Sequence, residues 1–211
     1  MKGIDLSTWK RREQFEMFSS MQSPQYNICA NVDVTATLEF CKKNQLSSFG
    51  AIAFVLTHVT NEIEHFRLRI REDRICVHDS VDPSFTFLKE DDSFGYGTVS
   101  YEPKLLSFCH DINQVIRASS TSSDFSPNHT RDDIVYLSCL PWIQFTSITH
   151  AMNIPATDSI PRISWGKYFE MDNATMMPLS VQVHHGLADG IHVGRFFETV
   201  QDVLTSPNTY I

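Results

Sequence analysis

Residues 177–197 read MPLSVQVHHGLADGIHVGRFF, and this one stretch contains most of a strand, a loop and the start of a helix. The largely apolar residues at 176–183 are typical of a strand. After the loop, a final helix is predicted from the apolar residues that recur on one side, which are Val193, Phe196, Phe197, Val200, Val203 and Leu204. The loop HHGLADG concentrates two imidazoles, one carboxylate and two glycines, so we expect the functional site here.

The rest of the chain predicts strands and helices in an order without a regular βαβ rhythm. We expect strands at 26–34, 66–70, 75–81, 84–88, 134–140, 162–169 and 176–183. Helices are predicted over 9–21, just after residue 34, from an N-cap at Ser48, and over 105–116. Gly95 and Gly97 indicate a bend or bulge, and residues 119–133 a surface loop. This order favours an α/β fold of the α+β sandwich kind, with helices covering a mixed β-sheet, in a single domain of residues 1–211.

The composition argues against several classes of protein. A formal net charge of -8 provides no overall basic surface for a phosphate backbone, so no nucleic-acid partner is expected. The cysteines are odd in number and not closely paired, which favours reduced thiols; they are Cys29, Cys41, Cys76, Cys109 and Cys139. No apolar stretch has the form of a signal peptide or the length of a membrane span, so we expect a cytoplasmic protein with no membrane partner.

From the residues alone, the paired histidines of the loop allow several interpretations. An ordinary core or surface role is the most frequent one for such a pair. His184, His185 and Asp189 could also bind a metal, but adjacent residues on a strand point to opposite faces and make poor joint ligands. Nucleophilic catalysis by a cysteine is a weaker interpretation still, because no cysteine lies at a predicted helix start.

Five stretches of the sequence form a series of motifs, which are WKRREQFE (9–16), VDPSFTF (81–87), LPWIQFTSI (140–148), PRISWGKY (161–168) and the stretch at 177–197. Together they resemble successive motifs of chloramphenicol acetyltransferases. They follow the order of the family and span roughly residues 9–204. Other coenzyme A-dependent acyltransferases, including dihydrolipoyl acyltransferase cores, share a related double-histidine motif. The resemblance implies the coenzyme A-dependent acyltransferase fold and an acetyl-CoA-dependent O-acetylation of chloramphenicol.

For the catalytic residues, the resemblance implies that His185 is the general base and that Ser147 stabilises the tetrahedral intermediate. Asp189 and Arg11 would form an ion pair that supports the site. This agrees with elementary chemistry, because a neutral imidazole can take a proton from an alcohol that attacks a thioester. A hydroxyl can donate a hydrogen bond to the resulting oxyanion.

For binding, the resemblance implies that Ser164, Lys167 and Tyr168 approach the coenzyme and that Met17 and Phe18 contact the acceptor. Acetyl-CoA would be a co-substrate, with no permanently bound cofactor and no metal. The resemblance also implies a homotrimer whose sites lie between subunits.

Some residues depart from the family pattern and leave the acceptor open. Gln14 stands where the family often has His, and Gly186 where it often has Ala. One alternative is therefore the same chemistry on another small hydroxylated acceptor. A second alternative is a noncatalytic binding protein of the same fold.

Overall fold

A seven-stranded sheet forms the centre of the computed structural model, which describes residues 1–72, 74–119, 131–152 and 157–210. Its order is β2-β10-β8-β7-β5-β6, with β9 paired to β10. The strands are β2 (Gln25–Asp33), β5 (Asp82–Leu88), β6 (Phe94–Thr98), β7 (Ile134–Leu140), β8 (Arg162–Gly166), β9 (Phe169–Met171) and β10 (Ala174–His184). β7 is parallel to β5 and β8, whereas the other pairs are antiparallel, so the predicted mixed sheet is confirmed.

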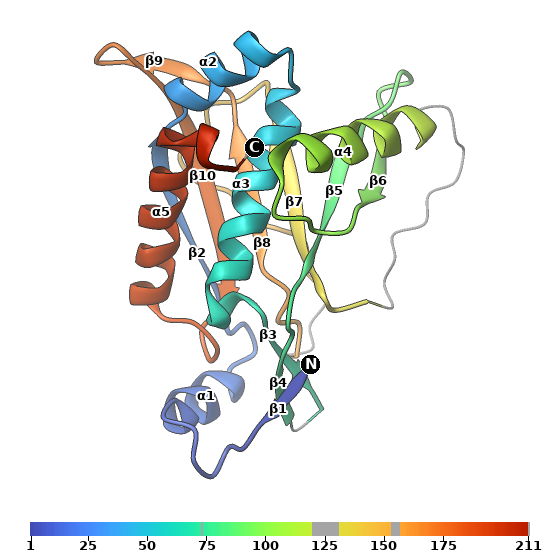
Figure 1. The fold of residues 1–211 in the computed structure, drawn as a ribbon. Helices are drawn as coiled ribbons and strands as arrows, with labels where there is room; N and C mark the ends of the chain where they lie inside the picture. Colours follow the sequence, from blue (N-terminus) through green and yellow to red (C-terminus); the bar gives the residue numbers. More distant parts are fainter. Residues whose placement is uncertain (73, 120–130, 153–156, 211) are drawn as a thin grey trace.

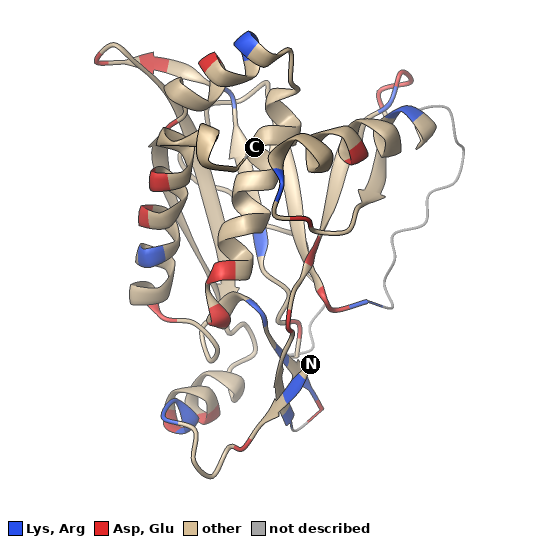
Figure 2. Cartoon of the chain, viewed as in Figure 1, with Lys and Arg blue, Asp and Glu red and all other residues tan. Residues whose placement is uncertain are grey.

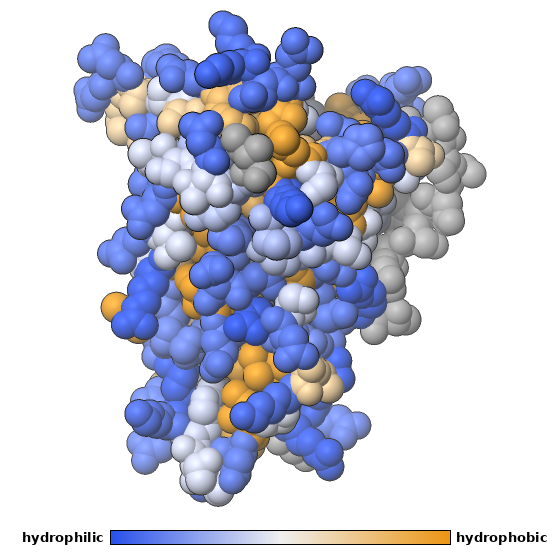
Figure 3. Space-filling view, viewed as in Figure 1, coloured by the Kyte–Doolittle hydropathy of each residue, from blue (hydrophilic) through white to orange (hydrophobic). Residues whose placement is uncertain are grey.

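Helices cover one face of this sheet, as Figure 1 shows. They are α2 (Thr35–Asn44), α3 (Ser48–Glu62), α4 (Leu105–Ser119) and α5 (Gly190–Thr205), with short turns η1 (Glu64–Phe66) and η2 (Pro207–Tyr210). α3 packs between α4 and α5 and buries Ile52, Phe54 and Leu56, each of which contributes about 1.5 to 3 kcal/mol of hydrophobic stabilisation. Charged residues of α5 lie on its outer side (Figure 2), and the same view is mostly hydrophilic (Figure 3). None of the described helices has the length and apolar character needed to cross a bilayer.

The start of α3 differs by one residue from the prediction. Its N-cap is Ser47, whose hydroxyl accepts a hydrogen bond from the backbone N–H of Gly50 at 3.3 Å. Ser48 is instead the first residue of the helix. Two adjacent serines are equally suitable caps by residue type, and only the backbone geometry distinguishes them.

A smaller unit lies beside the N-terminus, at the lower end of the view in Figure 1. It contains α1 (Arg12–Ser19) and a three-stranded sheet of β1 (Lys2–Ile4), β4 (Arg74–Val77) and β3 (Leu68–Arg71). Its core consists of Phe15, Leu68, Ile70, Ile75 and Leu187. Leu187 belongs to the HHGLADG loop, so this second core anchors that loop. β1 was not predicted, because three residues are too few to show a period.

The stretch around Gly95 and Gly97 is a regular strand, so the prediction of a bend or bulge was wrong. It forms β6, which pairs antiparallel with β5. A Cβ atom at Gly95 would lie 2.6 Å from the ring of Phe87, and one at Gly97 would lie 2.6 Å from the ring of Phe85. The glycines are therefore present because phenylalanine rings of the neighbouring strand occupy the space above them.

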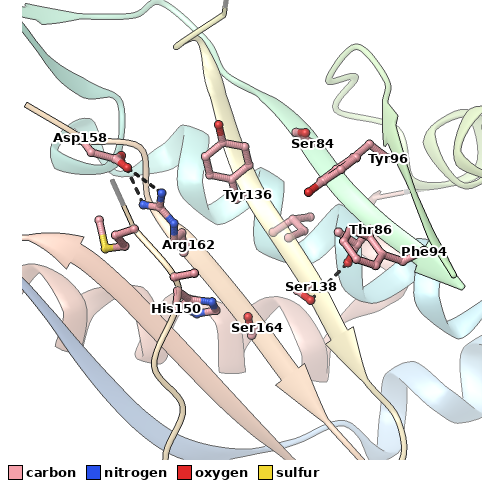
Figure 4. A pocket seen from close by; sticks show the side chains of 13 residues that line it. Ser84, Thr86, Phe94, Tyr96, Tyr136, Ser138, His150, Asp158, Arg162 and Ser164 are labelled. Carbon is pink, nitrogen blue, oxygen red and sulfur yellow. Dashed lines mark hydrogen bonds and ion pairs between the residues drawn. The ribbon is translucent and has the colours of Figure 1, made fainter. Parts of the chain in front are cut away.

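The face of the sheet away from the helices carries polar side chains. Along β5, β7 and β8 every second residue points to this face, because successive strand residues alternate. These residues are Ser84, Thr86, Tyr136, Ser138, Arg162 and Ser164. Figure 4 looks onto this open face, with the helices behind the strands. The chain after β7 crosses towards β2, where Asn27 donates to the carbonyl oxygen of Ile148 at 3.0 Å and Gln25 to that of Asp158 at 2.9 Å.

Candidate active site

The HHGLADG loop is held by backbone hydrogen bonds at both ends. The N–H of His185 donates to the carbonyl oxygen of Pro24 at 2.8 Å, and those of Leu187 and Ala188 donate to that of His184 at 2.9 and 3.1 Å. Asp189 is the N-cap of α5, and its N–H donates to Nδ1 of His192 at 2.9 Å. The loop therefore holds His185 and Asp189 at fixed positions between a central strand and a helix.

Two aromatic rings hold the imidazole of His185. The ring of Phe18 stacks on it at a centroid distance of 3.8 Å and an interplanar angle of 9°. The ring of Tyr26 lies against it at 4.3 Å. Burial raises the pKa of Tyr26 to about 12, with a smaller effect of the Asp189 carboxylate in the same direction, so this phenol stays neutral at physiological pH. The imidazole thus lies in an aromatic clamp of Phe18 and Tyr26.

Asp189 and Arg11 form the predicted ion pair. Arg11 Nη2 donates to Asp189 Oδ1 at 2.9 Å, and Arg11 Nη1 makes a second, short contact with Oδ2. The Arg11 side chain is 12% exposed and that of Asp189 33%. The hydrogen bond from Arg11 is the main reason why the pKa of Asp189 lies below its ordinary value. Arg11 also donates to the backbone oxygen of His185 at 3.3 Å, so the pair supports the loop directly.

Asp189 also lies close to the imidazole of His185. Its Oδ1 is 3.4 Å from His185 Nδ1, a buried atom that makes no hydrogen bond within the described residues. Arg11 occupies both carboxylate oxygens at better geometry. The ion pair is therefore the main interaction of Asp189, and the contact with the imidazole is secondary.

The neighbouring residue His184 has quite different surroundings. Its side chain is buried, and its Nδ1 accepts a hydrogen bond from the N–H of Gly186 at 3.1 Å. A Cβ atom at Gly186 would come within 3.0 Å of this ring and 3.2 Å of the Phe15 ring, which explains the glycine there. Because His184 uses Nδ1 inside the loop, the two histidines do not present a joint pair of ligands.

A cavity of ≈ 510 Å³, here called the open-face cavity, lies on the polar face of the sheet (Figure 4). It is lined by Ser84, Thr86, Phe94, Tyr96, Tyr136, Leu137, Ser138, His150, Ala151, Met152, Asp158, Arg162 and Ser164. Ser138 and Ser164 are directly opposite on neighbouring strands, and the hydroxyls of Ser138 and Thr86 are 3.2 Å apart. Hydroxyl groups thus form a row across three strands.

The hydroxyls of Ser164 and Ser138 differ in their hydrogen bonding. Ser164 is 1% exposed, and its buried Oγ makes no hydrogen bond within the described residues. Ser138 already contacts Thr86. Both side chains can offer a donor to a molecule in the cavity.

Ser147 lies on an exposed part of the chain after β7 and does not line the open-face cavity. Ser138 does line it, although it is not among the residues predicted from the sequence. The two serines stand on either side of the Pro141–Trp142 pair. The signal for Ser138 is the strand period, because Val135 and Leu137 are buried and Ser138 must then point to the other face.

A second cavity of ≈ 380 Å³ contains two of the predicted coenzyme residues. It is lined by Ser48, Phe49, Cys139, Pro141, Trp165, Gly166, Lys167 and Tyr168. Burial raises the pKa of Tyr168 to about 12 and that of Cys139 also to about 12, so both groups are neutral there. Lys167 is exposed at this cavity, whereas the third predicted residue, Ser164, lines the open-face cavity instead.

The predicted acceptor residues Met17 and Phe18 are on α1, away from both cavities. Met17 is exposed, and Phe18 stacks on His185. The ring contacts and the ion pair of His185 are with Phe18, Tyr26 and Asp189, none of which lines the open-face cavity. Within the described part of one chain, His185 is therefore not among the residues that line this cavity.

Known proteins are similar to this chain in both sequence and fold. The family model described as chloramphenicol acetyltransferase matches residues 1–201. A chloramphenicol acetyltransferase of Klebsiella is 31% identical over 94% of this chain and 91% of its own length. One of Clostridium perfringens is 30% identical over 99% and 96%.

Solved structures support the same assignment. A chloramphenicol acetyltransferase structure matches with a TM-score of 0.91 and 27% identity over 97% of this chain and all of that one. The dihydrolipoamide acetyltransferase of Azotobacter vinelandii shares the fold, with a TM-score of 0.69 and 15% identity over 94% and 88% of the two chains. Together with the full-length family match, these similarities show that the chain belongs to the chloramphenicol acetyltransferase family, a family of acyltransferases.

Proposed function

We propose that this chain transfers the acetyl group of acetyl-CoA to a hydroxyl of chloramphenicol, with His185 as the general base. The observation that supports this best is the clamped imidazole of His185, held by Phe18 and Tyr26 beside the Arg11–Asp189 pair. Such fixed geometry is what a general base needs, because proton transfer depends on reaching one particular hydroxyl. A cytoplasmic location and a single domain of residues 1–211 are part of the same proposal.

In the reaction, the neutral imidazole of His185 removes the proton of the acceptor hydroxyl while that oxygen attacks the thioester carbonyl. The C–O bond forms first, and the C–S bond then breaks to release coenzyme A as its thiolate. The proton held by the imidazole passes to that thiolate, which returns the base to its neutral form. General-base catalysis of this kind is worth about 10² to 10⁴-fold in rate.

The tetrahedral intermediate needs a hydrogen-bond donor for its oxyanion, and we propose Ser138 for this role. Its hydroxyl lies in the open-face cavity and belongs to the row with Thr86 and Ser164. Ser147, which the resemblance to the family suggests, remains the alternative. Losing one such donor costs about 10² to 10³-fold in kcat, so the two serines can be distinguished by substitution.

The coenzyme would use the second cavity, where Lys167 and Tyr168 lie together. The ammonium group of Lys167 is exposed beside the cavity and suits a phosphate of the coenzyme. Tyr168 offers a neutral phenol. Ser164 would contact the reacting end of the coenzyme from the open-face cavity, which shares strands β7 and β8 with the second cavity.

A homotrimer with shared sites would bring the separate parts together. In such an assembly, His185 of one subunit faces the open-face cavity of its neighbour. Exposed apolar side chains support an interface, since Trp142 is 63%, Ile143 54% and Met17 51% exposed in the single chain. Trp142 and Ile143 lie on the segment that follows β7, next to the second cavity, and Met17 lies on α1 one residue before Phe18.

The direct test is incubation of the protein with acetyl-CoA and chloramphenicol, with released thiol and product mass followed together. We expect acetylated drug in step with thiol, unchanged by a chelator. Thiol release without acetylated drug would indicate another acceptor. Absence of thiol release with every alcohol tried would favour the noncatalytic binding protein.

A further inference from the structure

The open-face cavity contains an ion pair that the acetyl transfer itself does not use. Arg162 Nη2 donates to Asp158 Oδ2 at 2.7 Å and Nη1 to Oδ1 at 3.3 Å, a two-bond arrangement visible in Figure 4. The side chains are 14% and 19% exposed. Arg162 Nη1 also donates to the carbonyl oxygen of Ile160 at 3.3 Å, and the guanidinium lies 5.2 Å from the ring centre of Tyr136. The pair is therefore fixed in place before any ligand arrives.

The cavity carries no net charge. Asp158 neutralises Arg162, and the remaining ionisable ring that lines the cavity and could be charged near neutral pH is His150. Burial, and to a smaller extent Arg162, lowers the pKa of His150, so this imidazole stays neutral. A charged ligand would lose its hydration here without finding an unpaired opposite charge among the described residues, which is unfavourable.

The open-face cavity nevertheless offers hydrogen-bonding groups to a ligand. Ser164 Oγ and His150 Nε2 are buried and make no hydrogen bond within the described residues. The carboxylate of Asp158 and the guanidinium of Arg162 each keep further capacity, because a carboxylate accepts about four hydrogen bonds and a guanidinium donates five. The rings of Tyr96 and Tyr136 add flat surfaces that suit the C–H groups of a ring.

We propose that this cavity selects an uncharged acceptor rich in hydroxyl groups, and that the Asp158–Arg162 pair recognises two neighbouring hydroxyls of it. The carboxylate accepts from these hydroxyls while the guanidinium donates to their oxygens. This inference rests on the proposed acetyl transfer and names its acceptor class. Chloramphenicol is likewise uncharged and keeps one hydroxyl besides the one that is acetylated, so the pair would bind it through that single hydroxyl.

Two matched alcohols test the proposal. Methyl α-glucoside and cyclohexylmethanol both carry a hydroxymethyl group on a six-membered ring, but only the glucoside has further ring hydroxyls. We expect the native protein to acetylate the glucoside with the higher kcat/KM. α-Glucose 1-phosphate keeps the same ring and primary hydroxyl with added negative charge, and we expect it to be the poorest of the three.

The variant for the test replaces both members of the pair, Asp158→Leu with Arg162→Leu, so that no charge is left unpaired. It should lower kcat/KM for the glucoside and for chloramphenicol by about 10- to 100-fold, the range expected for hydrogen bonds to charged groups. The value for cyclohexylmethanol should stay the same or rise. Arg162→Lys is a milder second variant, which keeps the charge but loses the two-bond geometry. It should lower kcat/KM for the glucoside by a smaller factor and leave the value for cyclohexylmethanol unchanged.

A matched control changes the exposed ion pair of α1, Arg12→Gln with Glu16→Gln, which should leave all acceptors unaffected. Equal losses for glucoside and cyclohexylmethanol in the Leu variant would overturn the inference, because the pair would then be structural. So would a native preference for cyclohexylmethanol or for the phosphate. If no alcohol and no chloramphenicol is acetylated, the proposed function fails. Calorimetry with methyl α-glucoside then decides the inference: binding to the native protein but not to the Leu variant supports it, and no binding overturns it.

Discussion

The adjacent residues His184 and His185 have chemically identical side chains but lie in different surroundings. His185 is partly exposed between Phe18 and Tyr26, whereas His184 is buried and bonded to the loop backbone. The alternation of strand residues predicts that the two point apart. The burial of His184 could not be predicted from the sequence, because it depends on the packing of Leu187 and Phe15 in the second core.

His185→Ala should reduce kcat by about 10² to 10⁴-fold with coenzyme binding and thermal stability nearly unchanged, since it removes the base and little packing. His184→Ala should instead lower the melting temperature, because it empties a buried position and leaves the Gly186 N–H without its acceptor. Steady-state kinetics and thermal unfolding on both variants make the comparison. If His184→Ala lost more kcat than His185→Ala, His184 would be the general base.

Ser138→Ala and Ser147→Ala form a second matched pair, which identifies the oxyanion donor. We expect Ser138→Ala to lower kcat by about 10² to 10³-fold and Ser147→Ala to change it little, because only Ser138 lies in the cavity. A larger effect of Ser147→Ala would restore the assignment from the family resemblance. An effect of Ser138→Ala on KM alone would make it a binding residue.

The Arg11–Asp189 pair should show strong coupling in a double-mutant cycle. Asp189→Asn and Arg11→Val should each destabilise, by less than the about 3 to 5 kcal/mol of fully buried pairs because Asp189 is one-third exposed. The double variant should lose clearly less than the sum. Strict additivity, with Asp189→Asn losing activity at unchanged stability, would favour a carboxylate that acts on His185 instead.

The same pair predicts the sign of an acid effect. Because the folded pKa of Asp189 lies below its ordinary 3.8, its contribution to stability is present above pH 3.8 and is lost as pH falls through the lower folded value. In Arg11→Val this contribution should largely disappear. Unfolding free energies of native and variant protein, measured between pH 3 and 6, should therefore converge towards the acid end.

At the scale of elements, periodicity predicted the long strands and helices, and failed where tertiary packing decides. β2, β7, α4 and α5 have clear patterns of period two or 3.6 within their own residues. β6 does not, because glycine is a poor strand former, and its two glycines are explained only by phenylalanine rings from β5. β1 is a strand only because β4 pairs with it.

Two glycine substitutions test this interpretation of β6. Gly97→Ala should lower the melting temperature strongly, since its Cβ would meet Phe85 at 2.6 Å and Val115 at 2.9 Å. Gly194→Ala, in α5 where nothing lies within 4 Å, should stabilise by about 0.5 to 1 kcal/mol. Thermal unfolding of the two variants should shift in opposite directions. If Gly97→Ala were neutral, the ring would have space to move and the packing explanation of β6 would be wrong.

At the scale of the whole molecule, the mixed sheet and its helical cover were predictable from the order of elements, whereas a site divided between subunits was expected only from the resemblance to the family. The sequence places His185 and the residues of the cavity without indicating how far apart they lie. His185 follows the end of β10 and is not among the described residues that line the cavity on β5, β6, β7 and β8.

Mixed trimers test the shared site. Subunits with His185→Ala, combined with subunits that carry Asp158→Leu and Arg162→Leu, should regain activity on chloramphenicol, because some sites then combine an intact base with an intact cavity. Homotrimers of each variant provide the baseline. Verified mixed trimers no more active than this baseline would contradict a site built from two subunits.

The alternation along β5, β7 and β8 also has a consequence for how such an enzyme can diversify. Each outward side chain of the open-face cavity stands between two inward neighbours, as Ser138 stands between Leu137 and Cys139, so it can be exchanged without disturbing the helical core. The base lies on another element with its own support. New acceptor preferences can therefore arise through substitutions of lining residues outside the hydroxyl row and the Asp158–Arg162 pair, such as Ser84, with His185 left unchanged.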